Sequence, residues 1–211
     1  MPFFVAVYQE VRSELLDEAL VEMRRNFAES HRQYPGRRSS RIFQGLENPQ
    51  MLIAVAEWDT ERDFDQLRQS PNYQIATEQA DPPARIESLT RLRSFVRMSR
   101  QPAYVACIRI AAQPGQADAL EAVILGEVRR DVEASDGLIS HDVFRVGKQP
   151  GQMVIVHGWT ALDALDQFRQ RTRPHHRELI EPLAIATDRF TGTIAVQYTR
   201  QLAPTRGAGS S

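Results

Sequence analysis

The chain has 211 residues, with 26 lysines and arginines against 27 aspartates and glutamates and a formal net charge of −1. This balance provides no basic surface, so neither nucleic acid nor an anionic membrane is expected as a partner. No apolar run approaches the roughly 20 residues of a membrane span, the N-terminus lacks a signal-peptide pattern, and Cys107 has no second cysteine to pair with. These features predict a cytoplasmic protein with a buried, unreactive thiol.

The first hundred residues alternate between strand-like and helix-like patterns. Alternating β-formers indicate strands, and apolar residues at every third or fourth position indicate helices. In chain order we expect a strand at 3–11, a helix from Ser13 towards Pro35, strands at 38–46 and 51–58 joined by a turn at 47–50, a helix from 59 through Leu67, a short helical piece after Pro71 and a strand at 85–98. The run 51–58 is apolar almost throughout, so both of its faces should be covered.

The second hundred residues follow the same order. We expect a strand at 103–111, a helix at 114–134, strands at 138–147 and 152–159 joined by a turn at 148–151, helices at 161–171 and 174–183, and a strand at 188–199. The tail 203–211 consists mostly of small and polar residues and is expected to be disordered.

The two halves are also related residue by residue. The segment that begins at Trp58 returns 101 positions later at Trp159, so the two tryptophans of the chain occupy the same point of each half. Gly36 and Gly137 match at the same offset. The chain therefore contains two copies of one unit, which we place at 1–100 and 101–202.

Each unit has the β-α-β-β-α-β order of the ferredoxin-like fold. The helices of such a unit cover one face of its sheet and leave the other face to be buried elsewhere. We therefore expect an α+β protein in which two fused ferredoxin-like repeats pack sheet to sheet as an intramolecular, pseudo-dimeric α+β barrel.

A tryptophan ends the third strand of each unit and precedes a helical, proline-containing element. The carrying residues are Trp58 with Ser70-Pro71-Asn72-Tyr73, and Trp159 with Arg173-Pro174-His175-His176. With this arrangement the chain resembles the antibiotic biosynthesis monooxygenase family of the dimeric α+β barrel superfamily, over residues 3–98 and 103–199. Family members usually pair as dimers, so the resemblance implies a monomeric pseudo-dimer or a homodimer.

The resemblance also implies an activity. It suggests a monooxygenase that uses O₂ on a small, flat, hydroxylated aromatic of the polyketide type. Such an enzyme would need no metal and no tightly bound cofactor, and transient reduced flavin is the alternative.

The same resemblance places the site in a cavity between the sheet and the helices. Strand alternation puts Met153, Ile155 and His157 on the face of Trp159. A base must remove a substrate proton before O₂ reacts, and histidine suits this task because its ordinary pKa is near neutrality. The expected catalytic residues are His157 as base, Trp159 for orientation and stacking, and His176 as a second donor.

Further residues are expected to contact the substrate, and they come from both units: Trp58, Tyr73, Phe144, Phe168 and His175. No spacing of histidines, cysteines and carboxylates predicts a metal site. The first unit has Ala54 and Ala56 beside Trp58 on the same strand face, so we expect it to be degenerate or mainly structural.

Two other functions remain open. Quinone-forming relatives carry Asn four residues before the tryptophan and Tyr six residues after it, whereas the second unit has Ile155 and Leu165 there. This departure favours a non-catalytic barrel that binds an aromatic or lipid-like metabolite. An isomerase or cyclase on the same scaffold would need the same base but no oxygen.

Other polar residues also have a structural interpretation. His157 on an apolar strand is often a satisfied core histidine. His141 is expected either to be exposed, to line the barrel or to be catalytic. His31 should be solvated, and the run Arg37-Arg38 with Arg41 should form a solvated strand edge, with binding of an acidic ligand as the alternative.

Overall fold

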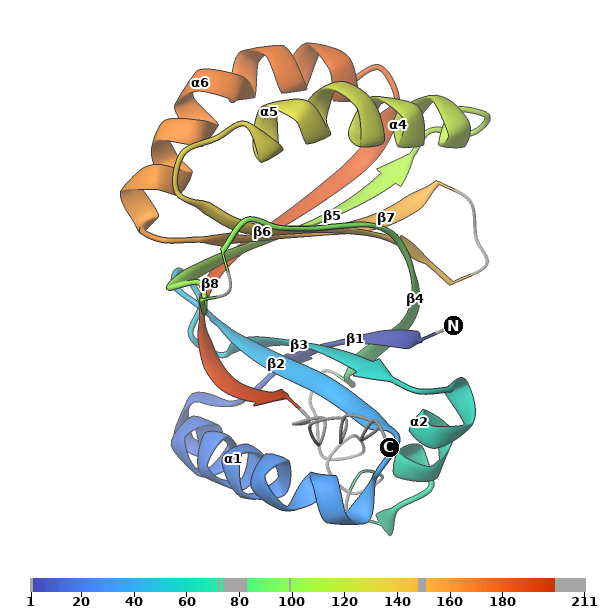
Figure 1. Ribbon diagram of the computed structural model, residues 1–211, viewed down its shortest axis with the longest axis vertical. Helices are drawn as coiled ribbons and strands as arrows, with labels where there is room; N and C mark the ends of the chain where they lie inside the picture. Colours follow the sequence, from blue (N-terminus) through green and yellow to red (C-terminus); the bar gives the residue numbers. More distant parts are fainter. Residues whose placement is uncertain (1, 72, 74–82, 99, 148–150, 200–211) are drawn as a thin grey trace, which may run out of the picture.

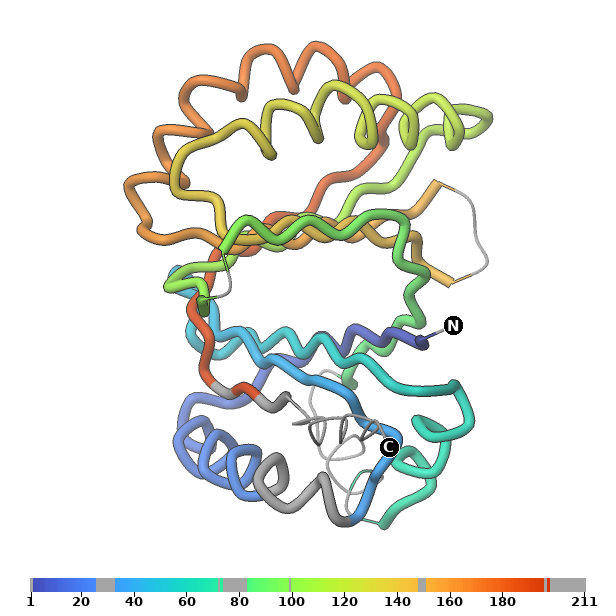
Figure 2. The backbone as a smooth tube through the Cα atoms, in the orientation of Figure 1, coloured from blue at the N-terminus to red at the C-terminus, as the bar shows by residue number. Residues whose placement is uncertain are grey.

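The structure is a computed structural model, and it describes residues 2–71, 73, 83–98, 100–147 and 151–199. For residues 26–32, 196, 198 and 199 only the backbone is described; Figure 2 shows the uncertain residues in grey. The helical piece expected after Pro71 falls almost wholly outside the described residues, as do most of the 148–151 turn and the whole tail 203–211.

The first half folds in the expected order. Its elements are β1 (Phe3–Glu10), a short 3-10 turn (Ser13–Leu15), α1 (Leu16–Gln33), β2 (Arg37–Gly45), β3 (Met51–Trp58), α2 (Glu61–Arg68) and β4 (Arg85–Val96). Helix α2 begins where the Thr60 hydroxyl accepts a hydrogen bond from the Asp63 backbone N–H at 3.3 Å. This bond satisfies one of the free donors of the first turn.

The second half also folds in the expected order, and it differs from the expectation in a few local details. Its elements are β5 (Tyr104–Ala112), α4 (Ala117–Val123), a π-helical segment (Ile124–Val128), α5 (Arg129–Glu133), β6 (Leu138–Val146), β7 (Gln152–Trp159), α6 (Leu162–Ile180) and β8 (Ala184–Thr199). The expected single helix at 114–134 is thus interrupted by a π-turn. The final strand begins at Ala184, four residues earlier than expected, because its first residues already pair with β5.

The segments expected as helices at 161–171 and 174–183 are mostly helical, but the expected break between them is wrong. They form one continuous helix, α6, with Pro174 inside it. Proline removes one backbone donor and usually breaks a helix. Here Leu165, Phe168 and Thr172 are buried along one face of α6 before the proline. Packing of that face against the sheet holds the helix together, because helix stability in proteins comes mainly from such packing.

All eight strands join in one closed barrel, in the order β1-β3-β2-β8-β5-β7-β6-β4. The fourth strand of each unit crosses to the other unit: β4 pairs with β1 and with β6, and β8 pairs with β5 and with β2. Figure 1 shows β4 and β8 curving from one sheet to the other on opposite sides of the molecule. The predicted intramolecular α+β barrel is confirmed, and its two halves are joined by strand pairing as well as by sheet packing.

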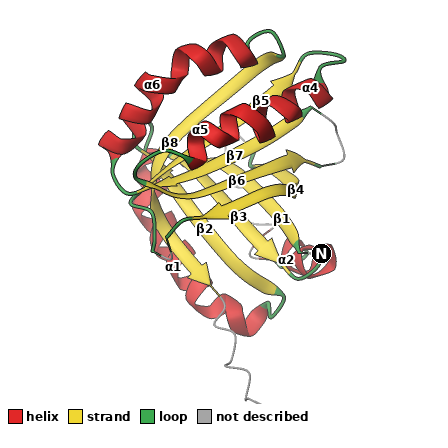
Figure 3. Ribbon diagram, turned by 45° about the horizontal axis from the view of Figure 1, so that its top comes forward, coloured by secondary structure: helices red, strands yellow, loops and turns green. Residues whose placement is uncertain are grey.

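The barrel has one interior and two outer layers. The space between the two sheets in Figure 1 contains a cluster of apolar side chains that includes Phe4, Phe43, Leu89, Phe144 and Val154. Helices α1 and α2 cover the outer face of one half, and α4, α5 and α6 cover the outer face of the other (Figure 3). No helix among the described residues is long and apolar enough to cross a membrane.

The repeated glycines lie where a strand approaches the helix that follows the tryptophan. Gly137 has φ +77°, and a Cβ added there would lie 2.6 Å from the Ala164 Cβ. Its carbonyl accepts the Thr160 N–H at 2.8 Å, as the Gly36 carbonyl accepts the Asp59 N–H at 2.7 Å. A side chain at Gly137 would force α6 away from the sheet, because both the backbone conformation and the available space require glycine.

Leu89 tests whether the barrel interior is a packed core. It is 4% exposed on β4 and pairs with Phe4 of one half and Val146 of the other. We expect Leu89→Ala to lower the free energy of unfolding by about 2–5 kcal/mol in urea denaturation. The matched control is Leu46→Ala, where the side chain is 41% exposed and the expected loss is less than about 0.5 kcal/mol. Equal losses for the two variants would contradict a packed interior.

Candidate active site

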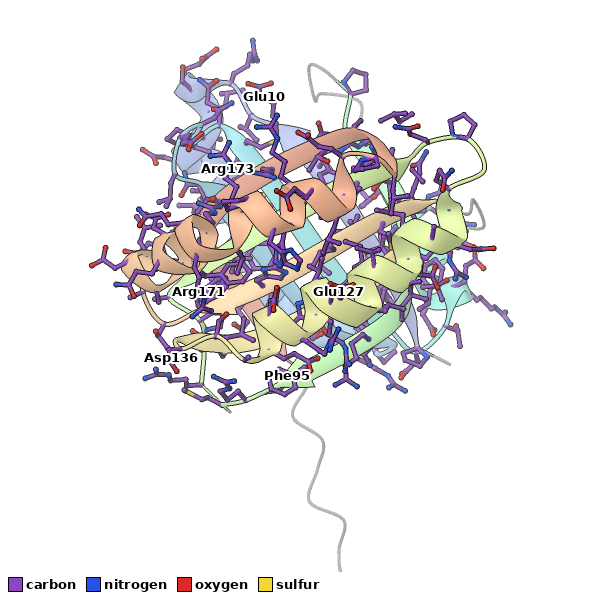
Figure 4. All side chains as sticks on the ribbon, turned by 90° about the horizontal axis from the view of Figure 1, so that it is seen from above. Glu10, Phe95, Glu127, Asp136, Arg171 and Arg173 are labelled. Carbon is purple, nitrogen blue, oxygen red and sulfur yellow. The ribbon has the colours of Figure 1, made fainter. Side chains whose placement is uncertain are left out.

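A cavity of about 690 Å³ lies between the sheet and the helices of the second half. Its floor comes from β5, β7 and β8, and its walls come from α6 and the π-helical segment with α5. Figure 4 looks down on this layer, with α6 and the α4–α5 pair lying across the strands. The apolar lining residues are chiefly Ala106, Ile108, Ile124, Val128, Val132, Ile155, Leu165, Phe168 and Ile180. An apolar enclosure of this size suits a small flat ligand.

Two histidines occupy adjacent strands at the inner end of this layer. His157 lines the cavity from β7, and His141 is its direct partner on β6. Their ring centroids are 4.9 Å apart, and the two residues are 2% and 0% exposed. His141 therefore neither lies at the surface nor lines the barrel, so those two expectations are wrong. A bulge between Leu138 and Ser140 sets the register that turns His141 to the helix side.

All four ring nitrogens of His141 and His157 lack a hydrogen-bond partner among the described residues. A buried polar group without a partner costs about 1–3 kcal/mol. Of these four nitrogens, the two of His157 belong to a residue that lines the apolar cavity, and a catalytic role is one explanation for such a group.

The first half has neither histidine at the matching positions. In place of the His141–His157 pair, its strands β2 and β3 pair Ser40 with Ala56. Ser40 is 1% exposed. The expected loss of chemistry in this half is consistent with these residues, because neither side chain has a group that titrates near neutrality.

His176 is held at the cavity wall by a carboxylate from another helix. Its Nε2 lies 2.9 Å from the Asp131 Oδ2 of α5, and the side chain lines the cavity. His175 instead points outward: its side chain is 51% exposed, and its Nε2 lies 3.5 Å from the Glu127 Oε2. Of the two adjacent histidines on α6, the structure thus brings only His176 into the site.

Phe168 connects the two cavity histidines. Its ring centroid lies 6.3 Å from that of His157 and 5.9 Å from that of His176. Trp159 packs behind Phe168 at 5.1 Å and is 0% exposed. Trp159 therefore supports the aromatic wall from within the core, and it does not line the cavity.

Burial keeps the inner histidines neutral. It lowers the pKa of His141 to about 4, despite the opposing charge of Glu133. Burial, with smaller contributions from His141, His176 and Arg169, lowers the pKa of His157 well below its ordinary value. Burial also lowers the pKa of His176, and here the Asp131 carboxylate opposes the shift. At neutral pH these imidazoles each offer one acceptor and one donor nitrogen.

The other expected site residues lie elsewhere. Trp58 and Tyr73 both pack against Phe64 in the first half, with ring centroids 5.7 and 6.3 Å away from it. Phe144 is 3% exposed in the barrel interior, on the opposite face of the sheet from the cavity. The structure does not bring these three residues together with His157.

The expectations for Cys107, Arg37 and Arg38 are resolved more simply, whereas the side chain of His31, expected to be solvated, lies outside the described residues. Cys107 is buried, as expected, and burial raises the pKa of its thiol to about 12, so the thiol is protonated at neutral pH. Arg38 is exposed and binds Asp59 at 2.6 Å. Arg37, expected at a solvated edge, is instead 8% exposed, with its guanidinium 5.1 Å from the centre of the Trp58 ring.

Sequence reasoning missed Asp131 and left the role of His141 undecided. Asp131 belongs to a helix whose sequence gives no sign that it meets His176, 45 residues away. The π-helical segment is also new: it places Ile124 and Val128 in the cavity wall. Such insertions occur frequently at functional sites. Among the described residues, no group of three or more histidines, cysteines and carboxylates is arranged to hold a metal ion.

Comparison with solved structures shows the same fold across nearly the whole chain. A putative monooxygenase from Lactobacillus acidophilus NCFM is 10% identical, with a TM-score of 0.69 and coverage of 94% of this chain and 96% of that one. An anthrone oxidase-like protein is 11% identical, with a TM-score of 0.76 and coverage of 96% and 95%. A putative monooxygenase from Fusobacterium nucleatum is 7% identical, with a TM-score of 0.76 and coverage of 94% of both chains.

At these identities the likeness shows a shared fold and nothing more. No curated protein sequence matches the chain. The family model for antibiotic biosynthesis monooxygenase, however, matches it twice, at residues 2–79 and 103–182. Since these two matches cover most of both halves, the protein belongs to the antibiotic biosynthesis monooxygenase family and carries two copies of its domain in tandem.

Proposed function

We propose that the protein is a monooxygenase that oxidises a small, flat, hydroxylated aromatic with O₂ in the cavity of its second half. The observation that carries this proposal is the neutral, buried His157, whose two ring nitrogens are without partners at an apolar cavity of about 690 Å³. Membership of the family and the fold shared with an anthrone oxidase-like protein support the reaction class.

The reaction that fits this site needs little beyond a base, a donor and exclusion of water. For a substrate with an activated CH₂ group, His157 removes one carbon-bound proton, and the resulting electron-rich anion reacts with O₂ to give a carbon-bound peroxide. Loss of the second proton breaks the O–O bond, so that CH₂ and O₂ become C=O and H₂O. No external electrons are required, because the substrate itself is oxidised by four electrons.

The described side chains divide these tasks. His157 is the proposed base, since its imidazole is already unprotonated at neutral pH. Neutral His176 donates its Nε2–H to Asp131, so its Nδ1 is an acceptor; we assign it the second substrate proton, which it then donates to the developing peroxide. Phe168, backed by Trp159, provides an aromatic surface on which a flat substrate can stack between the two histidines.

Oxygen uptake is the first test. We expect the protein to consume O₂ in air with anthrone-type hydroxyarenes, in the presence of a metal chelator and without added reductant. Oxygen uptake that requires NADH and a flavin reductase would show that the protein uses reduced flavin and is not cofactor-free. Substrate conversion without O₂ would indicate an isomerase or cyclase, and tight binding without conversion would indicate a binding protein; either result would contradict the proposal.

His157→Ala tests the proposed base. Loss of a general base costs about 10²–10⁴-fold in rate. We therefore expect kcat to fall by at least about 100-fold while the dissociation constant for a non-reacting anthracene changes by only a few-fold. His31→Ala, on α1 of the other half, is the matched control and should retain activity. A His157→Ala variant with normal kcat would remove this residue from the mechanism.

The pH dependence of kcat/KM reports the free enzyme. Burial lowers the pKa values of both His157 and His176 from the ordinary value of 6.5. Each imidazole is therefore mostly unprotonated at pH 6.5 and becomes protonated at a lower pH. We expect the acidic limb of the kcat/KM profile to lie below pH 6.5, measured where circular dichroism shows the protein folded. A limb at or above pH 6.5 would show that neither buried histidine is the titrating base.

A further inference from the structure

The rim of the cavity has an excess of positive charge that the proposed chemistry does not use. Four arginines line the cavity, Arg169, Arg173, Arg177 and Arg189, against one described carboxylate in the lining, Glu181. The whole chain has a net charge of −1, so this local excess does not follow from its composition.

Two of these arginines are already paired. Arg177 Nε lies 2.5 Å from the Glu181 Oε1 one helical turn along α6. Arg169 donates to the Thr191 hydroxyl at 2.5 Å and lies 3.4 Å from the Asp166 carboxylate. Arg173 and Arg189 form neither an ion pair nor a hydrogen bond within the described part of the chain, so two positive charges are left without a counterion.

The two unpaired arginines come from two elements that both line the cavity. Arg173 belongs to α6 and Arg189 to β8. Figure 4 shows Arg173 on the flank of α6 away from α5, and Arg171 on the opposite flank, where it donates to the Ser135 hydroxyl at 3.0 Å. Partial burial, followed by the charges of Arg173 and Arg169, lowers the pKa of Arg189. The positive charges of Arg173 and Arg169 thus disfavour the charged form of Arg189.

An anionic group at the rim would remove this repulsion. Guanidinium groups bind carboxylates through pairs of N–H donors in fixed geometry, and such charge-assisted bonds are among the stronger hydrogen bonds. Behind the rim the lining is apolar, and Ile185, which is 67% exposed, extends it to the opening. The opening thus presents a cationic entrance to an apolar chamber.

We propose that the substrate is an aromatic acid, whose carboxylate is held by Arg173 and Arg189 at the rim while its rings enter the apolar cavity. This inference rests on the proposed function for the identity of the reacting end, but recognition of the acid is a property of the rim and is measured without turnover. The carboxylate would fix which end of the flat molecule points towards His157.

The test is equilibrium binding of a fluorescent, non-reacting pair: anthracene-2-carboxylic acid and anthracene-2-carboxamide. The two probes have nearly the same size and rings and differ in charge. Fluorescence anisotropy with the wild-type protein should show about ten-fold tighter binding of the acid. Its affinity should fall as the salt concentration rises, and the affinity for the amide should change little.

Substitution of the rim then identifies the residues. Arg173→Gln combined with Arg189→Gln should reduce the preference for the acid to within about two-fold and leave amide binding unchanged. The matched control is Arg171→Gln, which removes an arginine from the opposite flank of the same helix and should keep the full preference. Circular dichroism and urea denaturation check that each variant is folded.

Each outcome bears on the proposal. Equal binding of acid and amide by the wild-type protein, binding of neither probe, or a preference that survives the double substitution would overturn it. The wild-type comparison and its salt dependence keep the test decisive even when the double variant does not fold. Preference for the acid without oxygen uptake from any hydroxyarene would leave the rim assignment standing and overturn only the oxygenase function.

Discussion

Strand exchange between the two halves is the constraint on which the rest of the structure depends. Each ferredoxin-like unit has one sheet face covered by its own helices and one face without a cover. Because β4 and β8 each pair with a strand of the other half, the two uncovered faces close around a single apolar interior. A barrel also leaves no open sheet edge, which protects the strands from pairing with other chains.

One face of each sheet is buried in the barrel interior, and the cavity lies on the other face, between the sheet of the second half and its helices. The interior contains packed side chains such as Phe144 and Val154, and the cavity at one end of it, about 360 Å³, is smaller than the 690 Å³ cavity of the second half. The cavity of about 690 Å³ lies instead between β7 and α6, where the side chains of the helix and the sheet do not fill the space between them. Successive side chains of β7 lie on opposite faces of the sheet: Val154 and Val156 pack in the barrel interior, and Ile155 and His157 line the cavity.

The two halves have diverged within this common frame. At the paired positions of the second and third strands, one half has Ser40 and Ala56, and the other has His141 and His157. Burial of two adjacent imidazoles is costly, since their four ring nitrogens lack partners among the described residues. The first half, with Ser40 and Ala56, can contribute to stability, while the second half holds the imidazoles that the proposed reaction needs.

The sequence by itself determined the repeat, the α+β class, the barrel and the strand face shared by His157 and Trp159, because these follow from periodicities of two and about 3.6 residues and from self-similarity at a fixed offset. Tertiary structure alone decided that His176 and not His175 enters the cavity, that Asp131 supports it, and that His141 joins His157 across a bulged strand pair. It also separated Trp58, Tyr73 and Phe144 from the site and kept α6 continuous through Pro174. The physical reason is the same in each case: a local pattern fixes which face of an element is apolar, whereas contacts between residues far apart in the chain depend on register, bulges and the packing of one element against another.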